Sequence, residues 1–325
     1  MAKELVLENG VWKLKAATPA DSGGIKLSRK YVTFANCAKS PEKIVDSGIT
    51  IGRPNSNWFS NDFVLGNSSL FVDNIVTGSS DPSASGAISE LLTTSNNLNF
   101  GYEDDFSCSF WLKCSYTNDN NGLVGTWSGD SSSSTDAKGF LFYINSGENG
   151  RPRFIFGTDS SIGGYFRVKV DSELDDNTWK HVCLTWEGTT NTITSLNYDT
   201  YLKVYYDGSS QPLTDFDVGL SGTSTSPSFA ANDLKFQVGT YRWKENYPNL
   251  NYSTNSRRFD EMGIWSKTLS ASEVSALYNS GNGVFCNTVA SSDLITRYSF
   301  DIESTDNNYK ILDKIGNNHL EIVLP

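Results

Sequence analysis

The chain has 325 residues, of which 38% are hydrophobic, 13% aromatic and only 19% charged, and its formal net charge is −11. This negative balance opposes contact with a phosphate backbone, so we expect no nucleic-acid partner. No stretch approaches the ~20 consecutive apolar residues that a membrane-spanning helix needs, so we expect no membrane insertion. Abundant aromatic residues, with Gly, Asn, Asp and Ser for turns, are typical of an all-β protein.

The first 62 residues have a mixed pattern. The stretch "ELVLENGVWKLK" alternates in part and predicts one or two short strands, whereas "KSPEKIVDSGITIGRPNSNW" is turn-rich and contains two prolines. We expect residues 1–62 to be an N-terminal arm or small β module that docks onto another protein. The start lacks the apolar core and cleavage site of a signal peptide. We therefore expect the chain to remain in a cytoplasm, where a virion would assemble, or to leave by a route other than a cleaved signal.

From residue 63 onward, short strand-like runs alternate with turns rich in Gly, Asn, Asp and Ser. Roughly ten such runs follow one another at intervals of roughly 10–15 residues. The clearest are "FSCSFWLKC", "GLVGTW", "GFLFYIN", "RPRFIFGT", "GYFRVKV", "KHVCLTW", "YLKVYYDG", "DLKFQVGTY" and "FDEMGIWS". Because no helical segment separates them, the pattern predicts a two-sheet antiparallel sandwich or jelly roll.

One helix is predicted, directly after the last of these strands. Ser270 is placed to cap it and Glu273 follows three residues later, as in a capping box. Val274, Leu277 and Tyr278 then recur at the i, i+3, i+4 spacing of one helix face, so we expect them to pack against the sandwich.

The five cysteines are odd in number, irregularly spaced and without a C-x-x-C pair that would hold zinc. We expect them to be buried thiols that act as small apolar residues, with a disulfide or a reactive thiol as the alternative. They are Cys37, Cys108, Cys114, Cys183 and Cys286.

Four stretches resemble the concanavalin A-like lectin/glucanase superfamily, in its laminin G-like (pentraxin-like) branch. They are "LGNSSLFVDN" (65–74), "LNFGYEDDFSCSFWLKC" (98–114), "NTWKHVCLTWEG…YLKVYYDGS" (177–209) and "FDEMGIWSKTLSASEVSALYNSGNG" (259–283). They stand in the order and spacing typical of the family. The resemblance implies a concanavalin A-like jelly roll over residues 63–283, with the helix as a fold marker after its closing strand.

The C-terminal tail, residues 284–325, contains "SDLITRYSFDIESTDNNYKILDKIGNNHLEIV", which resembles the first strand of the same family. That strand pairs with the last one in this fold. We therefore predict that Leu294–Phe300 lies beside Phe259–Trp265, as in a circular permutation. The alternative is that the tail begins a second, truncated repeat.

We expect no catalytic site. Asp260 and Glu261 are adjacent, so in a regular strand they would point to opposite faces and could not act as a pair. The acids of "YEDDFS" (102–107) lie in a turn. Only two histidines are present, and His181 belongs to a family strand motif, where we expect a structural role.

Calcium is an open possibility that the resemblance implies, because such domains often hold this ion with Asp side chains at a sheet rim. The candidates are Asp73, Asp104, Asp105, Asp207 and Asp260. For Asp207 the alternative is a "DG" hairpin-turn residue, and Asp104 and Asp105 can equally be turn formers.

For sugar binding we look to aromatic residues in polar, Gly- and Asn-rich surroundings, which would be exposed and would stack on pyranose rings. The candidates are Trp127, Tyr241, Trp243, Tyr247 and Tyr252, four of them in the polar loop "YRWKENYPNLNYSTNSRR". By contrast, Trp111, Trp179, Trp186 and Trp265 belong to strand motifs, where packing is expected.

The leading functional hypothesis is a non-enzymatic structural protein of a bacteriophage virion, a capsid decoration or fibre protein, with cell-surface glycans as a ligand. Virion or surface-assembly proteins would bind residues 1–62, and the protein could form a homo-oligomer. The alternatives are a calcium-dependent carbohydrate-binding module or adhesin on a bacterial surface or outside the cell, and, less favoured, a glycoside hydrolase.

Overall fold

In the computed structural model the chain divides into two compact units, residues 1–50 and 51–325. In the first unit, β1 (Lys3–Glu8) pairs antiparallel with β2 (Val11–Ala16), so the stretch predicted to form one or two short strands forms two. The domain boundaries predicted at residues 62 and 283 stay predictions. The structure describes residues 3–8, 11–16, 59–60, 62–66, 68–73, 90–93, 98, 100–114, 121–130, 133–144, 147–158, 164–174, 177–220, 235–239, 256–301 and 310–323.

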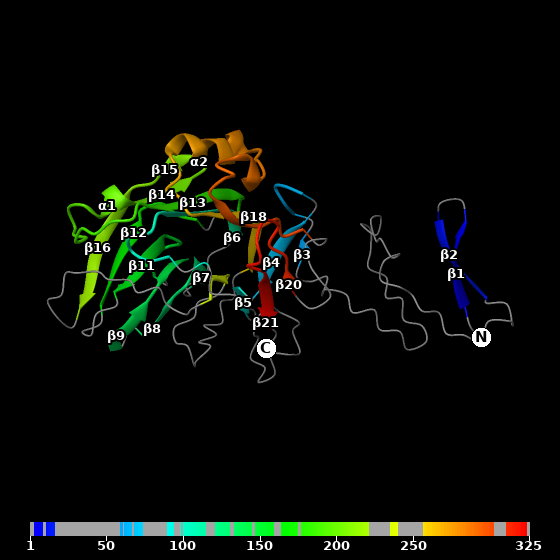
Figure 1. The fold of residues 1–325 in the computed structure, drawn as a ribbon, viewed down its shortest axis with the longest axis horizontal. Coiled ribbons are helices and arrows are strands. Elements are labelled where there is room, and N and C mark those ends of the chain that lie inside the picture. Colours follow the sequence, from blue (N-terminus) through cyan, green and yellow to red (C-terminus); the bar gives the residue numbers. More distant parts are fainter. Residues whose placement is uncertain are drawn as a thin grey trace. The chain divides into compact units, whose positions relative to one another are not determined.

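The second unit contains two large antiparallel sheets, which confirms the predicted sandwich (Figure 1). The first sheet has nine strands. In order across the sheet they are β16 (Leu213–Leu220), β12 (Gly164–Val170), β11 (Pro152–Thr158), β10 (Phe140–Ile144), β7 (Asn121–Gly125), β17 (Gln237–Val238), β5 (Glu90–Thr93), β21 (Leu320–Val323) and β20 (Lys310–Ile311).

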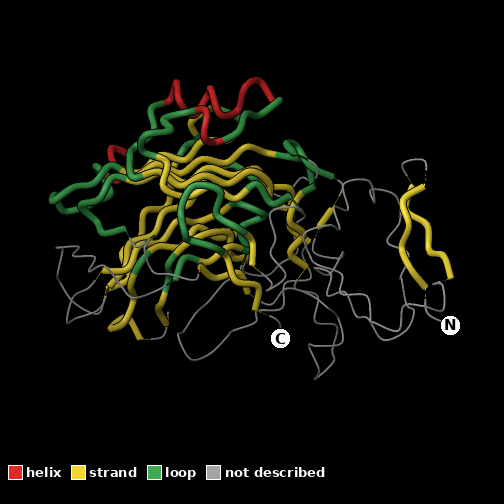
Figure 2. The backbone as a smooth tube through the Cα atoms, turned by 45° about the vertical axis from the view of Figure 1, so that its right-hand side comes forward, coloured by secondary structure: helices red, strands yellow, loops and turns green. Residues whose placement is uncertain are grey.

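The second sheet has eight strands. In order they are β15 (Ser209–Ser210), β14 (Leu202–Tyr206), β13 (Lys180–Trp186), β6 (Phe106–Cys114), β18 (Ser256–Trp265), β4 (Ser69–Asp73) and β3 (Phe59–Ser60), with β19 (Leu294–Tyr298) paired to β18. Figure 2 shows the strands of this unit in stacked layers, with the helices along one side. Within the described residues, no helix has both the length and the apolar character needed to cross a membrane.

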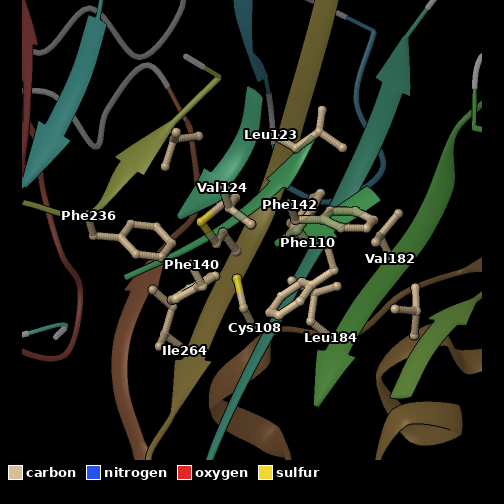
Figure 3. Packing of buried hydrophobic residues seen from close by; sticks show 14 of the residues in the cluster. Cys108, Phe110, Leu123, Val124, Phe140, Phe142, Val182, Leu184, Phe236 and Ile264 are labelled. Atoms are coloured by element: carbon tan, nitrogen blue, oxygen red, sulfur yellow. The ribbon is translucent and has the colours of Figure 1, made fainter. Parts of the chain in front are cut away.

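The core lies between the two sheets and is rich in aromatic rings. Phe140 and Phe142 of β10 point toward Phe110 of β6 and Leu184 of β13, and all four are fully buried (Figure 3). Strand side chains alternate between faces, so every second residue of these strands enters this layer. The four described cysteines, Cys108, Cys114, Cys183 and Cys286, are buried thiols outside any disulfide, as predicted, and Cys37 lies outside the described residues.

The predicted helix is α2 (Ala271–Tyr278), and its capping box is confirmed. The Glu273 amide donates to the Ser270 hydroxyl at 3.3 Å, and the Ser270 amide donates to Oε2 of Glu273 at 2.8 Å. Val274 and Leu277 are buried in a cluster with Trp265, on the outer side of the eight-stranded sheet. A second, one-turn helix, α1 (Tyr198–Tyr201), lies between β13 and β14 and was not predicted.

The C-terminal tail completes both sheets. β19 pairs with β18 through Trp265↔Leu294 and Met262↔Tyr298, which is the predicted pairing of the tail with the closing strand. β21 pairs with β5 in the nine-stranded sheet. The tail is therefore a strand donor to this sandwich, as the interpretation as a permuted first strand requires.

Candidate ligand-binding face

A second set of side chains on the nine-stranded sheet faces away from the core. Phe140, Phe142 and Phe154 enter the core, so the residues between them on β10 and β11 stand on the opposite surface. We call this surface the outer face. It is formed by Trp127, Leu141, Tyr143, Arg153, Ile155, Tyr165, Arg167 and Lys169, and the strand register places them in rows such as Tyr143↔Arg153↔Lys169 and Leu141↔Ile155↔Arg167.

The outer face is covered in its centre. Leu141, Tyr143 and Ile155 have exposed fractions of 0%, 3% and 5%, although they point away from the core. After β7 the chain forms a hairpin from β8 (Ser128–Asp130) and β9 (Ser133–Lys138), and β9 contacts both β11 and β12 (Figure 1). Contact with two adjacent strands at once indicates that the β8–β9 hairpin folds back across the outer face.

Tyr165 lies half-buried in a row that has no other side chain on the neighbouring strands. Its register partners are Gly157 on β11 and Gly219 on β16. Because glycine has no side chain, the ring of Tyr165 has only backbone beside it on both neighbouring strands. The Arg167 guanidinium lies 5.8 Å from its ring centroid, in cation–π range.

The described charges on the outer face are balanced. Each of three cations has a carboxylate partner: Arg153 pairs with Glu148 at 2.7 Å, Arg167 with Asp217 at 2.7 Å, and Lys169 with Asp215 and, at 3.8 Å, with Glu148. The hydrogen bond from Lys169 lowers the pKa of Asp215, so that carboxylate is ionised at neutral pH. Burial raises the pKa of Tyr143, so its hydroxyl keeps its proton.

Two buried side chains on this face have donors without a partner among the described residues. They are Nε1 of Trp127 and both Nε and Nη1 of Arg153. Trp127 is 4% exposed and Arg153 is 8% exposed. An unsatisfied buried donor costs about 1–3 kcal/mol, so a native structure that keeps three of them on one face calls for an explanation. Acceptor oxygens of a ligand would satisfy all three.

The aromatic residues predicted to bind sugar have mixed outcomes. Trp127 is on the outer face, but it is buried and not exposed as expected. Tyr241, Trp243, Tyr247 and Tyr252 lie outside the described residues. Sequence reasoning missed Tyr165 and Arg153. The signal was present, since "RPRFIFGT" and "GYFRVKV" place cations and Tyr at the outward positions of otherwise apolar strands.

The calcium candidates do not form one cluster where they are described, and calcium binding stays a prediction. Asp104 and Asp105 are exposed in the turn before β6, where they accept from the amides of Gly101 (2.6 Å) and Gly188 (2.8 Å). Asp207 is the hairpin-turn residue of the alternative interpretation: it and Gly208 have φ of 50° and 76°. Asp73 belongs to β4.

The expectation that Asp260 and Glu261 point to opposite faces is wrong. Phe259 and Met262 both enter the core, so the two acids between them share the outward face. The cause is a β-bulge: the register of β18 against β6 shifts between Asp260 and Gly263, and Glu261 has a φ of 37°. The bulge lies where the other edge of β18 changes partner, from β4 to β19.

Both acids of the bulge bind other segments of the chain. Oδ2 of Asp260 accepts from the amides of Val64 and Leu65, each at 2.8 Å. Glu261 accepts from the Cys286 amide at 2.7 Å and, with both oxygens, from Arg297 at 2.6 and 2.9 Å. Burial raises the pKa of Asp260 to about 7.

His181 has the structural surroundings that the sequence led us to expect. Its Nε2 lies 2.8 Å from the Ser109 hydroxyl, with both residues buried. Asp207 accepts from the His181 backbone amide and not from its ring. Burial lowers the pKa of His181 to about 3, so the ring is neutral at physiological pH.

Comparisons with known proteins agree with this architecture. A sequence model of the concanavalin A-like lectin/glucanases superfamily matches residues 85–275, more than half of the chain. No curated protein matches the sequence. Similar solved structures include a candidate carbohydrate binding protein from Bacteroides ovatus (16% identity, TM-score 0.46, 71% of this chain and 55% of that one). Others are the botulinum neurotoxin serotype G binding domain (15%, 0.42, 68% and 44%) and a heptameric SAP-like pentraxin from Limulus polyphemus (15%, 0.37, 63% and 84%). The chain spans about half the length of the first two.

Proposed function

Since the chain belongs to the concanavalin A-like lectin/glucanases superfamily, we propose that its sandwich is a non-enzymatic module that binds a glycan on the outer face of the nine-stranded sheet. The observation that carries this proposal is that one face has buried donors of Trp127 and Arg153 without a partner among the described residues, and also the half-buried ring of Tyr165, which packs against the cluster of Trp127. Glycan sites combine an aromatic surface with a few placed polar groups.

Each group has a role in this proposal. The ring of Tyr165 stacks on the apolar face of a sugar, since the glycines beside it leave room for a flat ligand. Nε1 of Trp127 and the free N–H groups of Arg153 donate to sugar hydroxyl oxygens. The β8–β9 hairpin contacts β11 and β12, the strands that carry Arg153 and Tyr165, so it lies next to the proposed site.

The absence of catalysis is supported by the use of the buried acids. A glycosidase needs two carboxyl groups free to act as acid and as base or nucleophile. In the described part of the chain, Glu261 is bound by Arg297 and Asp260 by two backbone amides. Among the described residues, no carboxylate binds the ring of His181 in the buried Ser109–His181 pair, so the third member of a catalytic triad is missing there.

The test is a glycan-binding screen of the full-length protein, run in calcium and again in excess chelator. Saturable binding is expected, and Tyr165→Ala should weaken it at least tenfold because the stacking surface is lost. Leu196→Ala, at a 91% exposed position between β13 and β14, is the matched control and should bind normally. Loss of binding in chelator would establish the predicted calcium dependence. A screen without any bound glycan would refute the proposal.

We further propose that the protein is a structural component of a virion, as a decoration or fibre protein, and docks through residues 1–62. The division of the chain supports this, since residues 1–50 form a compact unit of their own. A trimer or ring of the full-length protein in light scattering is the expected result. A monomer that binds glycan would favour the alternative, a bacterial carbohydrate-binding module or adhesin.

A further inference from the structure

We infer that the outer face accepts a neutral sugar residue and discriminates against sugars that carry a carboxylate or sulfate. The inference rests on the proposed glycan binding at this face and names its ligand class. It follows from the balance of charges around Arg153 and from the kind of donor that is left unpaired there.

The described cations of the outer face are all paired with carboxylates. Arg153 is neutralised by Glu148 at 2.7 Å, and Oε2 of the same glutamate lies 3.8 Å from Lys169. Arg167 and Lys169 each have a carboxylate of their own. An anionic ligand would therefore add an uncompensated negative charge to a largely buried site, which is strongly unfavourable.

The unpaired donors suit hydroxyl groups. Two buried nitrogens of Arg153, Nε and Nη1, have no hydrogen-bond acceptor among the described residues, and Nε1 of Trp127 is an uncharged donor in the same state. A sugar hydroxyl accepts from such a donor and at the same time donates its own hydrogen to a nearby carboxylate such as Glu148. A ligand carboxylate can only accept, and it would face Glu148 at close range. The mixed donor and acceptor set of this face therefore matches a neutral polyhydroxylated ring.

The experiment compares matched pairs of ligands on the full-length protein by isothermal titration calorimetry. Each pair is a neutral oligosaccharide and the same oligosaccharide with its C6 hydroxymethyl groups oxidised to carboxylates. We expect the neutral member to bind at least tenfold more tightly, with an affinity that stays constant between low and high NaCl. Equal or tighter binding of the acidic member would overturn the inference and leave glycan binding itself intact.

A charge variant makes the test sharper. Glu148→Gln removes one negative charge from the face, so the affinity for the acidic member should rise about tenfold while that for the neutral member changes less than about threefold. Glu103→Gln, in the exposed turn before β6, is the matched control and should change neither affinity. An unchanged neutral-to-acidic ratio in Glu148→Gln would contradict the inference. Failure of every pair to bind would overturn the proposed function together with it.

Discussion

At the scale of single residues, the two adjacent buried acids of the β18 bulge differ in their partners. Arg297 binds both oxygens of Glu261, and the side-chain exposure of Glu261 and Arg297 is only 1% and 13%. Asp260 has two backbone amides on one oxygen and no partner for Oδ1 among the described residues. A charge without a counter-charge is disfavoured in such a site, so burial raises the pKa of Asp260.

Replacing Asp260 by Asn should therefore change how stability depends on pH. Burial raises the pKa of Asp260 in the folded protein to about 7, from an ordinary value of 3.8, and the neighbouring Glu261 and Asp301 charges add to the rise. The folded state thus binds this proton more tightly than the unfolded state. Its stabilising contribution is complete below pH 4 and is lost as the pH rises through 7, with an upper bound of roughly 4 kcal/mol.

Urea unfolding of wild type and Asp260→Asn at several pH values between 4 and 8 measures this contribution. The variant keeps an acceptor for the Val64 and Leu65 amides, so it should lose the pH-dependent component and little else. The difference in unfolding free energy between the two proteins should shift in favour of the variant as the pH rises. The exposed Asp104→Asn serves as the control. A difference that is flat across this range would show that Asp260 is already ionised at pH 4.

At the scale of elements, β19 is fixed to the sandwich by one ion pair beyond its ladder. Arg297 lies opposite Gly263 in the β18–β19 register, and its side chain reaches back to Glu261 on β18. Gly263 is required there, because a Cβ at this position would lie 2.5 Å from the ring of Trp265 and 2.8 Å from Cys286. The bulge, the glycine and the ion pair together hold β19 against β18.

Arg297→Met should destabilise the protein by about 3–5 kcal/mol, since it leaves the buried Glu261 charge without its counter-ion. Adding Glu261→Gln should recover part of that loss, because the uncompensated charge is then removed. Chemical denaturation of both single variants and the double variant measures the coupling. If the double variant costs the sum of the two singles, the ion pair is not what fixes β19.

The β8–β9 hairpin is the element that should respond to ligand. If a sugar enters beneath it, the backbone amides of residues 128–138 should change their hydrogen-exchange rate when glycan is bound, while the amides of β6 should not. Exchange measured by mass spectrometry with and without saturating glycan tests this. An unchanged hairpin in the presence of saturable binding would place the sugar elsewhere on the molecule.

Sequence alone predicted the elements that carry local signals. Ser270 and Glu273 are three residues apart and make a capping box from local geometry, so α2 could be placed correctly. The tail strand was found because "LITRYSF" resembles the family's first strand. The bulge at Asp260 could not be found, because it lies where the pairing partner of β18 changes from β4 to β19. That change depends on tertiary structure and has no local sequence signal. The hairpin over the outer face was also missed, since "SGDSSSSTDAK" has the composition of a loop.

At the scale of the whole molecule, the cooperative unit extends beyond the residues that the family model matches. The match ends at residue 275, yet β19 and β21 complete one sheet each. Phe300 and Ile311 of the tail are fully buried in the main core cluster, beside residues of β6 and β18. Residues 1–50 form a separate unit by contrast. The two ends of the chain should therefore contribute very differently to stability.

Two terminal truncations test this difference. Deletion of residues 288–325 removes β19 to β21, opens an edge on each sheet and uncovers core side chains, so the thermal midpoint should fall by more than about 10 °C or the protein should not fold. Deletion of residues 1–50 removes a unit with its own contacts and should shift the midpoint by less than about 3 °C. Scanning calorimetry of both variants and the full chain gives the answer. If the 288–325 deletion is as stable as the full chain, the tail strands do not contribute to the stability of the sandwich. The alternative of a truncated repeat would then be the better interpretation.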